Sequence, residues 1–260
     1  FAPSSKVLFN CLRSIDLKIL SLFIIGLIII IFLVGRKRTR TSIVWAIGTT
    51  GFAGMVLELL LLFGFQVFYG YVFYEAGLLI TSLMAGIAAG SFTVTCRLNR
   101  IQQGIRTLLK IEAVMVIFSL LLAWLFLAYQ IIYHLNTVLV HSLFLVLLFL
   151  TGFFIGVEFP LANKIYSQSA HAGKSVPPTF PPPQGGDPNV RLGGRMKEGE
   201  EGTGLLYGAD LFGAWVGGLL GGFFLLPVLG LSNTCLLVAI LKAGSLLLLS
   251  KAKALPYRNG

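Results

Sequence analysis

The feature of this sequence that most constrains its fold is a series of apolar runs, each long enough to cross a lipid bilayer as a helix. A crossing takes about 20 consecutive apolar residues, and continuous runs such as LIIIIFLV and LFLVLLFL recur along the chain. The 260 residues are 56% hydrophobic and only 12% charged, which is too apolar for one soluble core. Barrel strands would alternate apolar and polar residues instead. The sequence therefore predicts an all-α, polytopic integral membrane bundle.

Seven transmembrane helices are predicted, separated by basic or turn-rich segments. Their approximate ranges are 17–35, 43–68, 76–96, 111–132, 137–160, 204–229 and 232–250. The domain organisation that follows is an outer N-terminal segment (1–16), helices one to five (17–160), a flexible cytoplasmic loop (161–203), a helical hairpin (204–250) and a cytoplasmic tail (251–260). The loop is predicted to be flexible because it is rich in proline and glycine.

The charge distribution predicts the orientation of these helices. Lysines and arginines gather in the loops that would all fall on one side, which is typical of the cytoplasmic face. The N-terminus is then outside, the C-terminus is cytoplasmic, and the expected location is the cell inner membrane. The net charge of +10 does not predict nucleic-acid binding, because no basic face carries interleaved aromatic residues.

Glycines at four-residue spacing in two of the predicted spans indicate close helix packing. Spacing of this kind lets two helix backbones approach each other. The glycines are Gly86 and Gly90 in the third span, and Gly213, Gly217 and Gly221 in the sixth.

Two charged residues of the last two spans are predicted to form a buried ion pair. Asp210 and Lys242 each lie roughly 10–12 Å from the inner end of their span, at about 1.5 Å per residue. The short outer turn LGLSN joins the two spans as an antiparallel hairpin. Such a pair either neutralises two costly charges and fixes the helix register, or acts as a proton-binding or ligand-binding switch.

Other polar residues inside the spans form a candidate ligand or proton site. Glu58, Gln66 and His141 are expected in the outer half of the membrane, where they would line an outward-opening pocket for a cation, an amine or a quinone head group. The alternative for His141 is a hydrogen-bonded core histidine. Glu158 lies near the inner end of its span, where a neighbouring lysine is expected to pair with it.

The sequence contains no signature of soluble catalysis or of a metal site. It has no HExxH or CxxC motif and no Ser-His-Asp set, and its three cysteines are isolated. No catalytic residue, metal ligand or cofactor is therefore predicted. A quinone or haem contact through a partner has no support from the residues.

Four stretches, GFAGMVLELLLLFGF, GLLITSLMAGIAAGSF, TGFFIGVEFPLANKIY and GLLYGADLFGAWVGGLLGGFFLLPVLGLSNT, occur in this order within residues 51–245. Together they resemble the polytopic membrane domain of spermidine synthase-like proteins, which is also described as fused to a transporter-like region. The resemblance implies a neighbouring aminopropyltransferase domain of Rossmann type that uses decarboxylated S-adenosylmethionine and a polyamine acceptor. No such domain occurs in these 260 residues, so this chain alone is not expected to be an enzyme.

Two functions are consistent with these features. The first is a membrane subunit or anchor that packs against other membrane or periplasmic proteins, including those of an electron-transfer or quinol-handling complex. The second is a transporter of a small solute, a polyamine or protons, in which Glu58, Asp210 and Lys242 bind the substrate or the proton. The glycine-striped helices favour the first function, and the buried charges favour the second.

Overall fold

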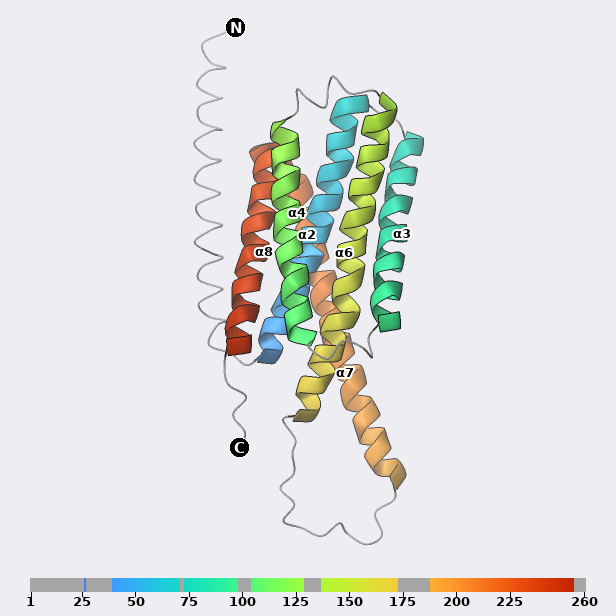
Figure 1. Ribbon diagram of the computed structural model, residues 1–260, viewed down its shortest axis with the longest axis vertical. Coiled ribbons are helices and arrows are strands. Elements are labelled where there is room, and N and C mark those ends of the chain that lie inside the picture. Colours follow the sequence, from blue (N-terminus) through green and yellow to red (C-terminus); the bar gives the residue numbers. More distant parts are fainter. Residues whose placement is uncertain are drawn as a thin grey trace.

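The computed structural model is a bundle of helices that stand side by side along one axis (Figure 1). It describes residue 26 and residues 39–70, 73–97, 104–128, 137–172 and 188–254. The helices are α2 (Thr39–Tyr69), α3 (Phe73–Arg97), α4 (Gly104–Leu127), α6 (Thr137–Ala172), α7 (Pro188–Leu220), the π-helical segment η2 (Gly221–Leu229) and α8 (Gly230–Ala254). Every regular element in these ranges is helical, as expected where a lipid environment leaves backbone groups to pair within the chain.

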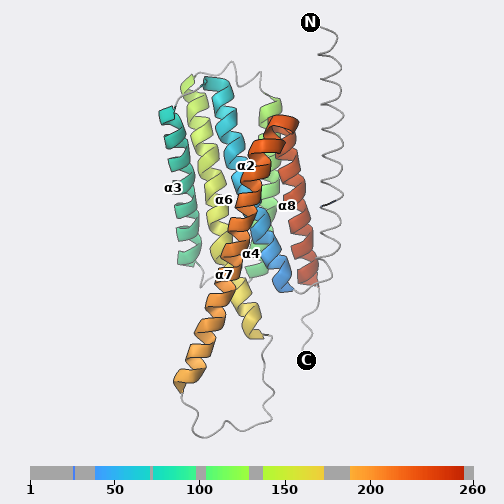
Figure 2. The same cartoon turned by 180° about the vertical axis from the view of Figure 1, so that it is seen from behind.

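Five helical stretches are long and apolar enough to cross a membrane. They are Thr41–Val67, Glu75–Arg97, Gly104–Leu127, Val138–Gln168 and Gly202–Lys251. The last stretch turns back on itself, so that α7 and α8 run in opposite directions (Figure 2). The predicted all-helical class is confirmed, and these five stretches have the length and composition of membrane spans. The predicted first span, 17–35, lies outside the described residues except for Gly26.

The segment predicted as a flexible loop, 161–203, is partly helical. Helix α6 continues to Ala172, and α7 already begins at Pro188. The lower ends of both helices extend beyond the other helices of the bundle (Figure 1). The prediction was wrong here because a helix does not need apolar residues once it leaves the hydrocarbon, and because proline is well tolerated at the first position of a helix. Residues 173–187 lie outside the described part.

The helices associate as three closely packed pairs, and the pair that includes α2 also contacts the other two. Helix α3 packs along α6, α4 along α8, and α2 along α7, while α2 also contacts α6, α8 and η2. Because the chain reverses direction at each connection, α3 and α6 run parallel, as do α2 and α7 (Figure 1). Helix α2 is accordingly the most buried of the membrane helices.

Glycines form the contact between α3 and α6. A Cβ atom added at Gly86 or Gly90 would collide with a backbone carbonyl oxygen of α6, at Phe149 and Phe153. Glycines of α6 make the reciprocal approach to the backbone of α3. The predicted packing role of Gly86 and Gly90 is confirmed, and any larger side chain at these positions would force the two helices apart.

Glycines of α7, and Gly221 at the start of η2, make a second close contact, with α2. A Cβ atom at Gly213 would collide with the carbonyl oxygen of Gly48, and one at Gly217 would lie 2.6 Å from that of Phe52. Gly221 is less tightly held, since its Cβ atom would meet a methyl group of Val56 at 3.2 Å. The predicted packing face of this helix is confirmed.

The turn between α7 and α8 begins with a change of helical register in η2. Pro227 lies inside η2, and proline lacks the N–H group that a regular helix needs at this point. The Thr234 hydroxyl lies 3.1 Å from the carbonyl oxygen of Leu225 and 2.6 Å from that of Gly230. Gly230 then takes a φ of +75°, a conformation that suits glycine and reverses the chain.

Candidate functional site: a buried cluster of two glutamates and one lysine

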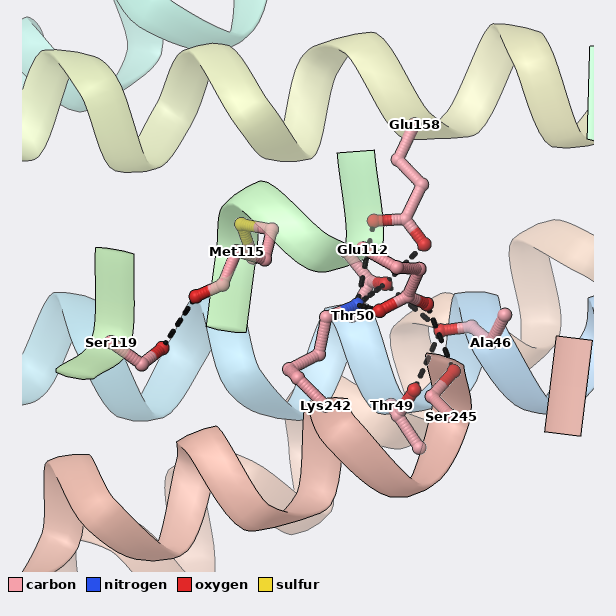
Figure 3. A network of polar contacts seen from close by, with 9 residues as sticks. All are labelled: Ala46, Thr49, Thr50, Glu112, Met115, Ser119, Glu158, Lys242 and Ser245. Carbon is pink, nitrogen blue, oxygen red and sulfur yellow. Dashed lines mark hydrogen bonds and ion pairs between the residues drawn. The ribbon is translucent and has the colours of Figure 1, made fainter. Parts of the chain in front are cut away.

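Lys242 of α8 lies at the centre of a polar cluster in the interior of the bundle (Figure 3). Its Nζ atom is 2.7 Å from Oε2 of Glu112 and 3.5 Å from Oε2 of Glu158. Nζ also donates a hydrogen bond to Oγ1 of Thr50, at 2.7 Å. The side chains of Lys242, Glu112 and Glu158 are each 0% exposed. One ammonium group is therefore shared by two carboxylates with no contact to solvent.

Two hydroxyl groups complete the cluster. The Thr50 hydroxyl lies 2.6 Å from Oε1 of Glu158, and Ser245 donates to Oε1 of Glu112 at 2.9 Å. Hydrogen bonds to charged groups are stronger than those between neutral groups. The Oε1 atom of each glutamate thus pairs with a hydroxyl group, and the Oε2 atom of each glutamate faces the ammonium group of Lys242.

Four different helices supply these side chains. Thr50 comes from α2, Glu112 from α4, Glu158 from α6, and Lys242 with Ser245 from α8 (Figure 3). Lys242 and Ser245 are three residues apart and so share one face of α8. At about 1.5 Å per residue, Glu112 lies about 12 Å from the start of α4 and Lys242 about 18 Å from either end of α8. The cluster therefore lies well inside the apolar length of these helices.

The cluster carries more negative than positive groups. If both glutamates are ionised, two negative charges face one positive charge, and the group has a formal charge of −1. Neither Oε2 atom has a hydrogen-bond partner among the described residues. The 2.7 Å contact between Oε2 of Glu112 and Nζ of Lys242 is a direct ion pair. A surplus charge in a dry interior is costly, so this arrangement favours the uptake of a proton.

The predicted ion pair between Asp210 and Lys242 is wrong. Lys242 pairs with Glu112 and Glu158 instead. Asp210 lies against α2, where its Oδ1 atom occupies the space that a side chain at Gly51 would need. Helix α2 packs between α7 and α8. The two helices of the hairpin therefore point their charged residues at different neighbours.

Asp210 still lies near the cluster without joining it. It is only partly buried, and it has no hydrogen bond or ion pair with a described residue. Glu158 and Lys242 are both within Coulombic range of its carboxylate. Asp210 is thus a further negative group at the border of the cluster.

The residues predicted to line an outer pocket do not form one polar group. Nδ1 of His141 lies 3.8 Å from Oε1 of Glu75, and its ring packs edge to face on Phe65 with a centroid distance of 5.4 Å. Glu58 and Gln66 are partly buried and have no hydrogen bond or ion pair with any residue that the structure describes. His141 is accordingly a partly buried residue with Glu75 as an acidic neighbour, and it contacts neither Glu58 nor Gln66 through a polar group.

Glu158 does pair with a lysine, but its partner comes from a different helix. The sequence analysis expected a neighbouring lysine as its partner, whereas the structure pairs it with Lys242 of α8. Glu112 was not predicted at all, because the fourth span was expected to begin at 111 and an acidic residue next to its start resembled a surface residue. Helix α4 begins at Gly104. A hydroxyl-bearing residue such as Thr50 gives no signal of its own, because most threonines in membrane helices bond only to the preceding turn.

Among the described residues, no group of three or more histidines, cysteines, aspartates and glutamates is arranged to hold a metal ion. No protein family, curated protein or solved structure matches the chain.

Proposed function

We propose that this protein is a proton-coupled membrane transporter of a small solute, with the cluster of Glu112, Glu158 and Lys242 as its proton-binding centre. The observation that carries the proposal is a fully buried ammonium group shared by two carboxylates from different helices. Ionisable residues inside membrane helices are costly, and they are characteristic of proton relays and ion pathways. The surplus carboxylate gives this cluster a neutral state with one bound proton and a charged state without it.

The packing of the bundle supports a mechanism of movement. The pair α3–α6 is locked by its glycines, α2–α7 is locked in the same way, and α4 packs along α8. Glu158 belongs to the pair α3–α6, whereas Glu112 and Lys242 belong to the pair α4–α8. Binding of a proton weakens the attraction between these two pairs, because it removes one of the two negative charges that hold Lys242. Rocking of one packed unit against another is the usual form of alternating access.

Cationic solutes, including polyamines, are the first substrates to test. Glu58 and Asp210 are partly buried carboxylates, and neither is paired with another described residue. A carboxylate in an apolar span favours a positively charged partner. These two residues are therefore the proposed contacts for a solute amine, whereas Lys242 belongs to the proton-binding centre.

The proposed topology has seven spans, with the N-terminus outside and the C-terminus in the cytoplasm of a cell with an inner membrane. The described lysines and arginines within the membrane stretches support it. Arg97, Arg106, Lys110, Lys164 and Lys251 all occur towards the same end of the bundle, where α3, α6 and α8 end and α4 begins. Basic residues favour the cytoplasmic side. The predicted segment 17–35 would supply the remaining span.

The test is proton movement in sealed vesicles. Purified protein is reconstituted with a trapped pH-sensitive dye, and polyamines, monoamines, amino acids and inorganic cations are added outside one at a time. The proposal predicts that at least one solute changes the internal pH, and that Glu158→Gln abolishes this change. Glu75→Gln removes a carboxylate far from the cluster and serves as the matched control. A signal that is the same in Glu158→Gln and wild type would overturn the proposal.

A second candidate function is a membrane subunit or anchor for partner proteins. Its support is a band of large apolar side chains on α7 and η2, in which Trp215 is 62% and Phe223 is 74% exposed. Gentle purification followed by mass spectrometry tests it, and stoichiometric partners, such as redox proteins of an electron-transfer complex, are the expected result. The resemblance to spermidine synthase-like proteins remains a prediction, and under it a separate aminopropyltransferase would be among those partners.

A further inference from the structure

The hydroxyl group of Thr50 has more neighbours than it has protons to donate. Its oxygen is 2.7 Å from Nζ of Lys242, 2.6 Å from Oε1 of Glu158 and 2.9 Å from the carbonyl oxygen of Ala46 (Figure 3). A hydroxyl group has one proton and two lone pairs. It can therefore accept from Lys242 at all times, but it can donate to only one of the two oxygens.

Two complete hydrogen-bond arrangements fit this geometry. When Glu158 is ionised, Lys242 donates to Thr50, and Thr50 donates to Oε1 of Glu158. When Glu158 carries a proton on Oε1, that proton is donated to Thr50, and Thr50 turns its own proton to the carbonyl oxygen of Ala46. The second arrangement leaves no donor without an acceptor, and the formal charge of the cluster changes from −1 to 0.

We infer that Glu158 holds the exchangeable proton of the cluster and that Thr50 is the positioning residue that makes room for it. The role of this proton in transport rests on the proposed function, under which Glu158 carries the coupling proton. The presence of the proton on Glu158 can be measured on the purified protein without any transport assay. Nothing else in the cluster has to move when Glu158 is protonated, since the same oxygen serves both arrangements.

Glu112 does not offer the same two arrangements. Ser245 donates to its Oε1 atom, and no second acceptor for that hydroxyl group occurs among the hydrogen bonds of the described residues. A proton on Oε1 of Glu112 would therefore leave one donor unpaired in a buried site, which is unfavourable. The Oε2 atom of Glu112 is also nearer to the ammonium group than that of Glu158, at 2.7 Å against 3.5 Å. Glu112 is therefore the carboxylate that makes the closer ion pair with Lys242.

The charged groups around Glu158 come from three other helices. Glu112 reaches it from α4, Lys242 from α8 and, at longer range, Asp210 from α7. The polar side chains that α2 and α3 bring to this part of α6 are the uncharged Thr50 and Ser91, the latter bonded to the backbone at Gly156. Two further carboxylates, those of Glu112 and Asp210, therefore share the surroundings of Glu158 with a single ammonium group.

The experiment is infrared difference spectroscopy of the purified protein in lipid nanodiscs, titrated from neutral to alkaline pH, where carboxyl groups in contact with water are already ionised. A protonated carboxyl group absorbs in its own region of the spectrum, so loss of the proton removes a band. We expect one such band in the wild type, its absence in Glu158→Gln, and its persistence in Glu112→Gln and in Glu75→Gln. Glu158→Asp keeps a carboxyl group and should shift the band, which provides a second variant if Glu158→Gln does not fold.

Thr50 is tested in the same spectra. Thr50→Val removes the hydrogen-bond partner of the protonated carboxyl group and should move the band and its titration midpoint, whereas Thr50→Ser should restore both. Thr49→Val is the matched control, because Thr49 also donates to Ala46 but does not contact Glu158. The inference is overturned if no protonated-carboxyl band occurs, if the band survives in Glu158→Gln, or if Thr50→Val leaves it unchanged.

The two proposals fail in different ways. A band that depends on Glu158 in a protein that moves no solute would leave this inference standing and refute the transporter. Solute-coupled proton flux together with a band that depends on Glu112 would support the transporter and refute the assignment of the proton to Glu158.

Discussion

Replacement of Lys242 by methionine is expected to destabilise the protein strongly. The change keeps a long side chain but removes the ammonium group that contacts Glu112, Glu158 and Thr50. Two carboxylates then face each other with 0% exposure and no cation. Removal of one partner from a buried ion pair typically costs about 3–5 kcal/mol, and we expect a loss of that size in the free energy of unfolding.

The triple variant Lys242→Met/Glu112→Gln/Glu158→Gln should recover most of this loss. It has no charge left to bury, and the two glutamines can still accept hydrogen bonds from Thr50 and Ser245. Replacement of a complete buried ion pair by neutral residues is often close to neutral in stability, so we expect this variant within about 1–2 kcal/mol of the wild type. Acidification should also restore part of the stability of the single variant, because protonated carboxyl groups no longer repel each other.

Unfolding by sodium dodecyl sulfate in mixed micelles, followed by circular dichroism, measures these differences. Lys251→Met is the control, because Lys251 is an exposed lysine near the end of the same helix, and surface changes usually alter stability by less than about 0.5 kcal/mol. The reasoning is refuted if Lys242→Met is as stable as Lys251→Met, or if the triple variant is less stable than the single one.

Three further substitutions test the fold around the cluster by the same unfolding assay. Gly90→Leu should cost at least about 1–3 kcal/mol, because the new side chain meets the backbone of α6; wild-type stability would contradict the close contact between α3 and α6. Asp210→Asn should change stability by less than about 1 kcal/mol, since Asp210 has no ion pair with a described residue, and a loss of several kcal/mol would restore the pairing expected from the sequence. Gly230→Ala should cost about 1–3 kcal/mol, because φ there is +75°, and an unchanged midpoint would argue against this turn.

The apolar runs and the glycine spacing were sufficient to predict the helical class and two of the faces through which helices pack closely. Both depend on local sequence, since the length of a run and a four-residue repeat can be read without knowing the neighbours. The partner of Lys242 could not be predicted in this way. Depth along the membrane follows from residue counting, but the direction in which a residue points depends on which helix lies beside it, and α2 lies between α7 and α8.

The other errors concern the ends of helices. Glu112 was missed because hydropathy placed the start of its span at 111, seven residues after the start of α4 at Gly104. The loop at 161–203 was predicted from composition, although α6 and α7 both continue into it. Hydropathy locates the hydrocarbon and not the helix, so a charged residue one or two turns inside a helix can resemble a surface residue.

The measurement that tests the central claim most directly compares two activities of the same vesicles. Once a transported solute is found, proton-driven accumulation and one-for-one solute exchange are measured for wild type, Glu158→Gln and Glu75→Gln. If Glu158 carries the coupling proton, Glu158→Gln should lose accumulation and keep exchange, while Glu75→Gln should keep both. Undiminished proton-driven accumulation in Glu158→Gln would contradict the account.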